Sequence, residues 1–367
     1  MNPARAHNVH DLRDAALRRL PRVAFDYLEG GAEDHLTFKA NREALDRIRF
    51  LPRTLVDVSR RSQRASIFGR WYDCPFGIAP TGAAGIYCHG AEIALARGAR
   101  DTNVPFVLST HSFVPLAQLR RLVGAAAWFQ MYIHPQRADT EAAVNAARDA
   151  GCEVLVLTAD APTGGNREYN YRNGFTMPVR MTRRTVLDGL CHPAWLASVY
   201  MRSLRGRRLS EWTTPHQYGT WEHLAWLRRI WPHKIVVKGV LTVEDARLAE
   251  QNGADGVWVS NHGGRQLDGA PASVEALPRI VEALGRRLTV MVDSGFRRGT
   301  DIVKALALGA DMVFVGRAAL YGAAAGGEAG VRRALEVLQS EVDRVLALLG
   351  CNTVAELGPQ HVRITSA

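Results

Sequence analysis

The amino-acid sequence predicts an α/β protein with the (β/α)8, or TIM, barrel architecture. Eight short apolar runs recur along the chain, each followed by a polar or glycine-rich stretch and then a helical pattern. Nearly continuous apolar strands that alternate with amphipathic helices are typical of a parallel sheet covered on both faces. Eight such units favour a closed barrel over an open sheet. The runs span 75–82, 105–111, 126–133, 153–160, 234–240, 256–263, 288–295 and 312–319.

The segments between the runs carry helix signals. The stretch 242–253 begins with Thr242, a residue type that caps helix N-termini, and ends at Gly253, a residue type that follows helix C-termini. The stretches 272–285 and 299–310 repeat the same apolar period. These helices are the connections that a parallel barrel requires.

The length of 367 residues would allow two domains at about 150 residues per domain. A barrel with insertions fills the same length, and we expect a single domain over 1–367. Residues 1–70 are expected to form an N-terminal helical extension with a cap, and residues 75–326 the barrel. A long amphipathic pattern over 327–350 predicts a C-terminal helix.

The composition excludes several classes of protein. Lys and Arg outnumber Asp and Glu by 46 to 36, a net charge of +10, so an acidic partner or an anionic surface is a candidate. The five cysteines form no C-x-x-C pair, which excludes a disulfide framework and a clustered zinc site. The sequence shows no secretory signal and no apolar run of the ~18 residues that a membrane span needs. We therefore expect a cytoplasmic protein that binds neither metal nor nucleic acid.

The insertion 177–219, after the fourth run, is unusually long and basic. It holds seven arginines against two acids, a net charge of +5. It also contains an apolar stripe at helical spacing, made of Trp195, Leu196, Val199, Tyr200 and Leu204. Two interpretations remain open. The segment is either an arginine-solvated lid over the barrel mouth or a basic amphipathic element that lies on an anionic membrane.

Polar residues stand at the C-terminal end of every run, where the active sites of barrel enzymes lie. Because the loops at this end converge, we expect the polar residues to form one site. They are Thr81, Ser109, Gln130, Tyr132, Thr158, Asp160, Lys238, Ser260, His262, Asp293, Gly316 and Arg317.

Three of these loops suggest specific chemistry. Lys238 ends an apolar strand, so it needs either an anionic ligand or a structural ion pair with an acid of a neighbouring strand. His262 and Arg265 lie on a glycine-containing loop, where an imidazole base and a carboxylate-binding guanidinium can face one ligand. Glycines beside arginines at 293–299 and 315–318 predict a phosphate pocket, although the arginines there would also suit solvated surface. No strand is followed by the G-x-G-x-x-G fingerprint of a Rossmann domain.

The motifs SNHGGRQLD (260–268) and DSGFRRGTDIVKALALGA (293–310) give the chain its likeness to a known family. The chain resembles the FMN-dependent L-2-hydroxy acid oxidases and dehydrogenases, which include glycolate oxidase and L-lactate dehydrogenase. The likeness runs from residue 25 through the final helix. Within the family it is strongest to the (S)-mandelate dehydrogenase branch, through YLEGGAED (27–34), LVDVSRRS (55–62) and GRAALYG (316–322).

The resemblance implies FMN as cofactor and assigns roles to individual residues. His262 would be the base, with Asp160 hydrogen-bonded to it. Arg167 and Arg265 would bind the substrate carboxylate, and Tyr27 and Tyr132 would contact the carboxylate and the hydroxyl. The residues that would hold FMN are Ala79, Pro80, Thr81, Ser109, Gln130, Thr158, Lys238, Ser260, Asp293, Gly295, Arg297, Gly316 and Arg317.

The resemblance also implies a reaction and partners. We expect oxidation of (S)-mandelate or a similar aromatic 2-hydroxy acid to the 2-keto acid, with a quinone or another acceptor and peripheral contact with the inner membrane face through 177–219. The alternative is a soluble oxidase that uses oxygen and releases hydrogen peroxide. An FMN-barrel isomerase or a phosphate-barrel lyase would leave Arg167 and Arg265 without a purpose. A homo-oligomer, specifically a homotetramer, is expected.

Two positions depart from the family pattern. The family usually carries an acid three residues after Arg167, where this chain has Asn170. Gly82 stands where oxidase relatives usually have Ala, and the smaller residue leaves more room beside the flavin. That favours a bulkier substrate and an electron acceptor other than oxygen.

Overall fold

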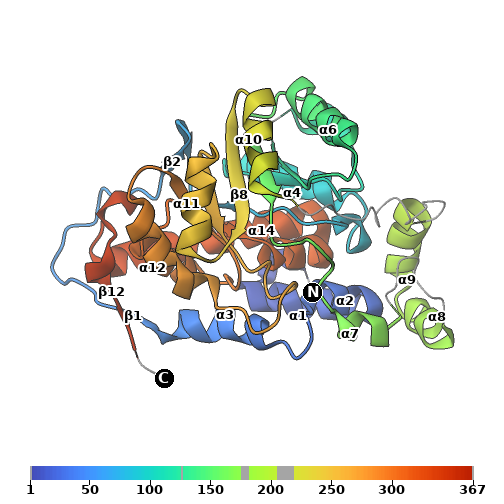
Figure 1. Cartoon of the computed structure of the whole chain (residues 1–367). Coiled ribbons are helices and arrows are strands. Elements are labelled where there is room, and N and C mark those ends of the chain that lie inside the picture. Colours follow the sequence, from blue (N-terminus) through green and yellow to red (C-terminus); the bar gives the residue numbers. More distant parts are fainter. Residues whose placement is uncertain (1, 125–126, 175–181, 205–218, 366–367) are drawn as a thin grey trace.

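The predicted barrel is present in the structure, a computed structural model that describes residues 2–124, 127–174, 182–204 and 219–365 (Figure 1). Eight parallel strands form one sheet in the order β4-β11-β10-β9-β8-β7-β6-β5, and a bridge between Ile78 and Phe106 links its two ends. Each strand lies within one of the predicted apolar runs. They are β4 (Phe76–Ile78), β5 (Val107–Ser109), β6 (Trp128–Met131), β7 (Val154–Thr158), β8 (Lys234–Val240), β9 (Gly256–Val259), β10 (Thr289–Val292) and β11 (Met312–Val315).

A ring of helices covers the outside of the barrel. The register of the sheet aligns the strand ends, so that Thr158 lies opposite Lys238 and the loops after neighbouring strands begin together. The helices that follow the strands are α4 (Ala91–Asp101), α5 (Leu116–Val123), α6 (Arg137–Asp149), α10 (Trp221–Ile230), α11 (Val243–Gln251), α12 (Ser273–Leu284), α13 (Gly299–Ala307) and α14 (Arg317–Leu349).

Aromatic and sulfur-containing side chains fill the barrel interior. Trp258 and Phe314 pack with ring centroids 4.0 Å apart, and both are fully buried. The hairpin of β2 (Ala65–Ile67) and β3 (Arg70–Tyr72) adds Ile67 and Tyr72 to this interior cluster. The packed interior leaves the loop end of the barrel for ligands.

The N-terminal extension contains α1 (Val9–Arg19), α2 (Arg22–Glu29) and α3 (Leu36–Arg47), together with the short η1 (Pro3–Arg5). The sequence did not indicate that β1 (Ile48–Phe50) pairs with β12 (Val362–Ile364) near the opposite end of the chain. The predicted C-terminal helix is the second part of α14, which bends at Gly326 and Gly327, where the backbone is not helical. The extension packs along α14 through α1.

The insertion after β7 stands apart from the barrel at one side of the molecule (Figure 1). Its described part contains α8 (Arg183–Leu190), α9 (Pro193–Trp195) and the π-helix η3 (Leu196–Leu204). The predicted apolar stripe does not form an outward face, because Trp195 and Val199 are buried and Trp195 Nε1 donates to the Ile86 carbonyl at 2.8 Å. Tyr200 of the stripe is exposed, as are Val186, Leu187, Leu190 and Met201 outside it. Arg180, Arg205, Arg207 and Arg208 lie outside the described residues.

Candidate active site

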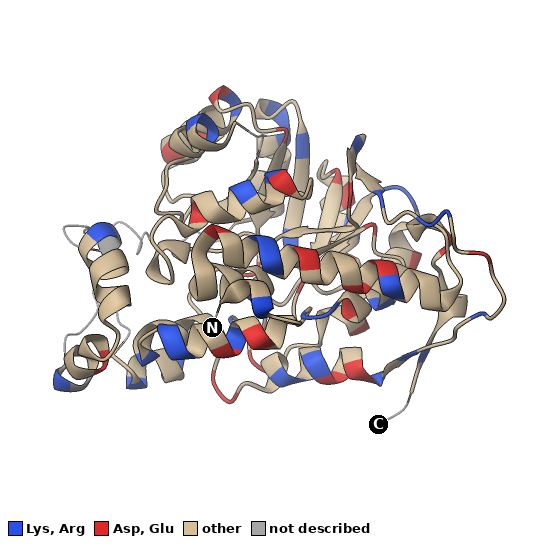
Figure 2. Cartoon of the chain, turned by 180° about the vertical axis from the view of Figure 1, so that it is seen from behind, with Lys and Arg blue, Asp and Glu red and all other residues tan. Residues whose placement is uncertain are grey.

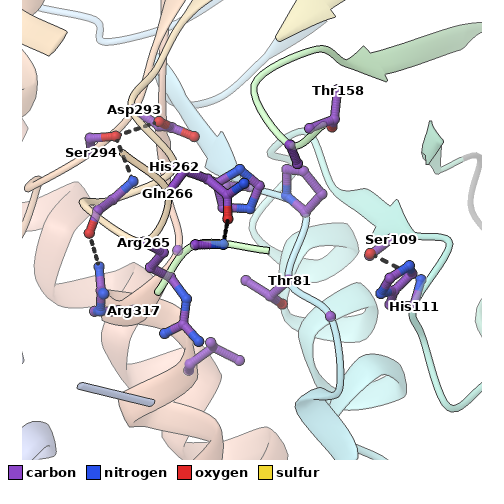
Figure 3. Close-up of a pocket in the computed structure, with 18 of the residues that line it drawn as sticks. Thr81, Ser109, His111, Thr158, His262, Arg265, Gln266, Asp293, Ser294 and Arg317 are labelled. Carbon is purple, nitrogen blue, oxygen red and sulfur yellow. Dashed lines mark hydrogen bonds between the residues drawn. The ribbon is translucent and has the colours of Figure 1, made fainter. Parts of the chain in front are cut away.

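A cavity of about 610 Å³ opens at the C-terminal ends of the barrel strands. It brings together most of the residues predicted from the strand ends and several from α2 and the loop after β7 (Figure 3). Of the predicted residues, Ser260 and Asp160 do not line the cavity but bond side chains that do. The predicted residues that line the cavity are Tyr27, Ala79, Pro80, Thr81, Ser109, Gln130, Tyr132, Thr158, Arg167, Lys238, His262, Arg265, Asp293, Gly295, Arg297, Gly316 and Arg317.

Lys238 is held by an internal network. Its Nζ lies 2.8 Å from Ser260 Oγ and 3.3 Å from Asp293 Oδ2. Ser260 Oγ in turn donates to Asp293 Oδ1 at 2.6 Å. The structural ion pair considered for this lysine therefore exists, and because Lys238 also lines the cavity, the same pair fixes a cation at its wall.

His262 is positioned by a carboxylate and by an unusual backbone conformation. Its Nδ1 lies 3.1 Å from Asp160 Oδ1, which leaves Nε2 as the ring atom able to accept a proton. The residue has φ 58°, in the left-handed region that non-glycine residues seldom adopt. Asp160 itself packs against Gly239, where a Cβ would lie 2.5 Å from the Asp160 Cβ, so only glycine fits at 239.

The electrostatics keep the His262 ring neutral. Burial lowers its pKa from the ordinary value of 6.5, and nearby Lys238 lowers it further. Asp160 opposes this by raising the pKa, but burial outweighs it. A neutral imidazole near neutral pH is the form that a general base requires.

An amide network forms the wall beside β5, β6 and β7. Ser109 Oγ donates to Gln130 Oε1 at 2.9 Å, and Gln130 Nε2 donates to Thr158 Oγ1 at 3.0 Å. All three side chains are buried. The network orients the Gln130 amide in the way that recognition of a polar ring edge requires.

One end of the cavity is strongly cationic. Arg297 and Arg317 are buried, and within the described part of the chain Arg317 donates to the carbonyls of Leu28, Gly30 and Gly263. Burial, with repulsion from Arg265 and Arg297, lowers the pKa of Arg317 to about 9. By contrast, Arg298 is paired with Glu341 and does not line the cavity. A buried cation pair without a carboxylate partner fits an anionic group such as a phosphate.

A second pair of arginines, Arg167 and Arg265, also lines the cavity. Arg167 Nε donates to the Arg265 carbonyl at 3.2 Å, and Arg265 Nη1 donates to the Tyr27 carbonyl at 2.7 Å. Burial, then repulsion from Arg265, lowers the pKa of Arg167. Arg167 is the N-cap of α7 (Glu168–Arg172). Although this chain has Asn170 where the family usually has an acid, Arg167 still lines the cavity.

Sequence reasoning missed several lining residues. Gln266 accepts from Arg167 Nη2 through Oε1 and donates to the Asp160 carbonyl through Nε2, so it links the backbone of Asp160 to Arg167. Ser294 bonds Asp293 and the Gly263 amide, and the Gly263 carbonyl accepts from Arg317 (Figure 3). His111 packs against Tyr132 with ring centroids 5.3 Å apart. Gln266 and Ser294 are polar neighbours of predicted site residues, which is the only signal that would have found them.

Comparison with known proteins supports the same chemistry. The family model described as FMN-dependent dehydrogenase matches residues 16–364. The chain belongs to this family. It is 43% identical to an (S)-mandelate dehydrogenase of Pseudomonas putida, over 97% of this chain and 93% of that protein. It is 42% identical to a putative L-lactate dehydrogenase of Mycobacterium tuberculosis, over 97% and 89%.

Solved structures are similar over nearly the whole chain. A crystal structure of the monotopic membrane protein (S)-mandelate dehydrogenase has a TM-score of 0.93 at 42% identity, covering 98% of this chain and 100% of that one. A mandelate oxidase variant with (S)-mandelic acid has a TM-score of 0.86 at 36% identity, covering 99% and 100%. The protein is therefore an FMN-dependent enzyme of the 2-hydroxy acid dehydrogenase and oxidase family, as the motifs indicated.

The cavity fits FMN on its own geometry. Two buried arginines at one end lack a carboxylate partner among the described residues and suit a phosphate. Gly295 has φ 89° and lies against Asn41, where a Cβ would be 2.9 Å away, so this close backbone approach needs glycine. The Gln130 amide and Lys238 supply the donors that a flavin ring edge requires.

Proposed function

We propose that this enzyme oxidises an aromatic L-2-hydroxy acid, of the (S)-mandelate type, to the 2-keto acid. The observation that carries the proposal is His262, held by the Asp160 carboxylate, on the same cavity as Arg167 and Arg265. Removal of two protons and two electrons from a 2-hydroxy acid needs a base, a carboxylate anchor and an electron acceptor.

His262 acts as the base in this proposal. Its Nε2 accepts a proton from the substrate, and the Asp160 carboxylate stabilises the imidazolium that forms. Because Asp160 Oδ1 is 3.1 Å from Nδ1, the ring is already oriented before substrate binds. A positioned base typically contributes about 10²–10⁴-fold to the rate.

Arg167 and Arg265 bind the substrate carboxylate. Guanidinium groups match carboxylates in two-bond geometry, and neither arginine bonds a carboxylate in the described part of the chain. Tyr27 and Tyr132 line the same cavity, and burial raises the pKa of Tyr132, which keeps its hydroxyl protonated as a donor. In this arrangement Tyr27 contacts the carboxylate and Tyr132 the hydroxyl.

Bound FMN supplies the electron acceptor of the reaction. Arg297, Arg317 and Gly295 would hold its phosphate end, and Gln130 and Lys238 its ring. The remaining residues that would line it are Ala79, Pro80, Thr81, Ser109, Thr158, Asp293 and Gly316, with Ser260 supporting Lys238. Lys238 keeps a positive charge at the cavity wall, where negative charge that develops during oxidation is stabilised.

The assignment of an aromatic substrate depends on the room beside Gly82 in the cavity and on the similarity of the chain to (S)-mandelate dehydrogenase. Gly82 lines the cavity, and a Cβ there would lie 3.0 Å from the His111 Cβ, so a larger residue would crowd this wall. The test is a panel of glycolate, L-lactate and (S)-mandelate, assayed aerobically with and without a dye acceptor. Highest kcat/KM for (S)-mandelate, dependent on the dye, supports the proposal. Turnover with oxygen alone, releasing hydrogen peroxide, supports the soluble-oxidase alternative.

We further propose that the insertion attaches the enzyme to an anionic membrane, where a quinone accepts the electrons. Figure 2 shows few charged residues over α8, α9 and η3, and Leu187 and Leu190 are more than 60% exposed. Large exposed apolar side chains of this kind mark interaction sites. No described helix has the length and apolar character needed to cross a bilayer, so the contact would be peripheral.

Liposome flotation tests this attachment. Leu187→Gln with Leu190→Gln should reduce binding to anionic vesicles at low salt, whereas Leu267→Gln, an equally exposed leucine elsewhere, should not. Failure of the unmodified protein to bind such vesicles contradicts the proposal and leaves 177–219 as a lid. The homotetramer stays a prediction, to be measured by light scattering in detergent.

A further inference from the structure

Two consecutive residues of α3, Asn41 and Arg42, bond two different loops of the candidate active site from the N-terminal extension. The base loop (residues 260–268) follows β9 and carries His262. The phosphate loop (residues 293–298) follows β10. The proposed function uses side chains of both loops and assigns no role to α3.

Asn41 is bonded to the base loop through a buried pair of side-chain amides. Its Nδ2 donates to Asn261 Oδ1 at 2.9 Å, and Asn261 Nδ2 donates to Asn41 Oδ1 at 2.8 Å. Both side chains are buried. Asn41 Oδ1 also accepts from the Ser273 amide, and Asn261 Oδ1 accepts from the Gly264 amide. The pair therefore fixes the residue that directly precedes His262.

The backbone conformation of His262 needs this support. Its φ of 58° is strained for a residue with a side chain, and such a conformation persists only when its surroundings over-determine it. Ser260 Oγ accepts from the His262 amide at 3.1 Å, and the Asp160 carboxylate lies 3.1 Å from the ring. The Asn41–Asn261 pair adds a constraint from α3. Without it, the backbone can relax and turn the imidazole away from its position at the cavity.

Arg42 supports the phosphate loop instead. Its Nη1 donates to the Gly295 carbonyl at 2.7 Å and to Asp301 Oδ2. The same Asp301 oxygen accepts from the amides of Arg297 and Arg298 at 2.8 and 2.9 Å. Arg42 thus joins the carbonyl of Gly295 to the backbone of Arg297, which carries one of the two buried guanidinium groups that fit a phosphate.

We propose that Asn41 and Arg42 are positioning residues that serve the two parts of the site separately. Asn41 holds the base loop so that His262 faces the substrate, and Arg42 holds the phosphate loop around the phosphate of FMN. Neither side chain lines the cavity, so each acts through the loop that it bonds. This inference rests on the proposed function, because it assumes that His262 is the base and that the phosphate loop binds FMN.

The test measures two properties of the FMN-loaded enzyme for each variant. Stopped-flow reduction of the flavin at saturating 2-hydroxy acid reports the base, and FMN release on dilution, followed by the fluorescence of the free flavin, gives the Kd for FMN.

Asn41→Ala keeps the Cβ and removes the amide. It should lower the rate of flavin reduction by ~10–100-fold, because a misplacement of about 1 Å can cost about 10²-fold. Its Kd for FMN should stay within about threefold of the unmodified value. Arg42→Met should show the opposite pattern. Its Kd for FMN should rise by ~10-fold, about the effect of one lost charge-assisted hydrogen bond, and the loaded enzyme should be reduced within about threefold of the unmodified rate.

Arg47→Met is the matched control for Arg42→Met. Arg47 lies on the same helix and pairs with Glu275 of α12, so this variant should leave the reduction rate and the Kd for FMN within about threefold. A merely structural role of α3 would instead change both properties together in Asn41→Ala and in Arg42→Met, and that result overturns the inference.

The remaining outcomes separate this inference from the proposed function. Reduction of Asn41→Ala at the unmodified rate overturns the inference. If Asn41→Ala does not load FMN, Asn41→Asp, which replaces only the amide donor to Asn261, decides by the same two measurements. If glycolate, L-lactate and (S)-mandelate all fail to reduce the unmodified enzyme, the proposed function fails. The Kd for FMN then decides alone, and an unchanged value in Arg42→Met overturns the inference.

Discussion

The cavity holds its charged groups in two different ways. Lys238 and His262 are each bonded to a carboxylate of the protein, at 3.3 Å from Asp293 and 3.1 Å from Asp160. The arginines of the same cavity donate to carbonyl and amide oxygens of the described residues. Lys238 and His262 therefore have a carboxylate partner even without a ligand. A buried guanidinium that lacks a counter-ion is instead stabilised when an anion binds. We expect this difference to separate residues that carry out chemistry from residues that bind ligands, and the following variants test that expectation.

Removal of the base should have the largest effect. His262→Ala is expected to lower kcat by about 10²–10⁴-fold, because only the proton acceptor is lost. FMN content should be unchanged, since the phosphate arginines and the Gln130 amide are intact. Stopped-flow reduction of the flavin by substrate measures the step directly. Reduction at a near-normal rate would remove His262 from the mechanism.

Breaking the ion pair between Lys238 and Asp293 should lower the free energy of unfolding more than it weakens ligand binding. Asp293→Ala leaves Lys238 buried without its carboxylate, and loss of one member of a buried pair costs about 3–5 kcal/mol. Urea unfolding measures the change. The control is Asp343→Ala, which breaks an exposed pair with Arg61 and should cost less than ~1 kcal/mol. Equal losses in both variants would contradict the distinction between buried and exposed pairs.

Removal of an unpaired arginine should weaken binding and leave the fold intact. Arg167→Ala or Arg265→Ala is expected to reduce the affinity for substrate and keto acid by ~1.5–3 kcal/mol, the value of a charge-assisted hydrogen bond. Steady-state KM and product inhibition report it. Arg172→Ala is the matched control, because this exposed arginine of α7 pairs with Glu168. Unchanged KM in both cavity variants would show that the carboxylate binds elsewhere.

The smallest expected effect is a shift in the pH dependence of kcat/KM. Because burial lowers the pKa of His262 from 6.5, kcat/KM should hold from neutral pH to below pH 6.5 and fall only at more acid pH, as the ring takes up a proton. Asp160 raises that pKa, so Asp160→Asn should move the acid limb to lower pH by about one unit. A limb that moved to higher pH would contradict the assigned pairing.

Much of the fold could be predicted from the sequence because each strand and helix of the barrel has its own short-range pattern of apolar residues. Each strand lies inside an apolar run, and the parallel topology then brings the residues that end those runs, such as Thr158 and Lys238, to one rim. The insertion shows the limit of such signals. Helical spacing identified an apolar face at Trp195 and Val199, but it could not tell that the protein itself covers that face.

The amino-acid sequence by itself determined the barrel, the family and the cavity residues that end its strands, because periodicity and motifs are local properties of the chain. Tertiary structure alone decided which charges are paired. Asp293 reaches Lys238 across 55 positions of sequence, and Arg265 donates to the Tyr27 carbonyl from 238 residues away. The Asn170 Oδ1 is buried without a hydrogen-bond partner among the described residues for the same reason, since burial and hydrogen-bond satisfaction depend on neighbours that only folding brings together.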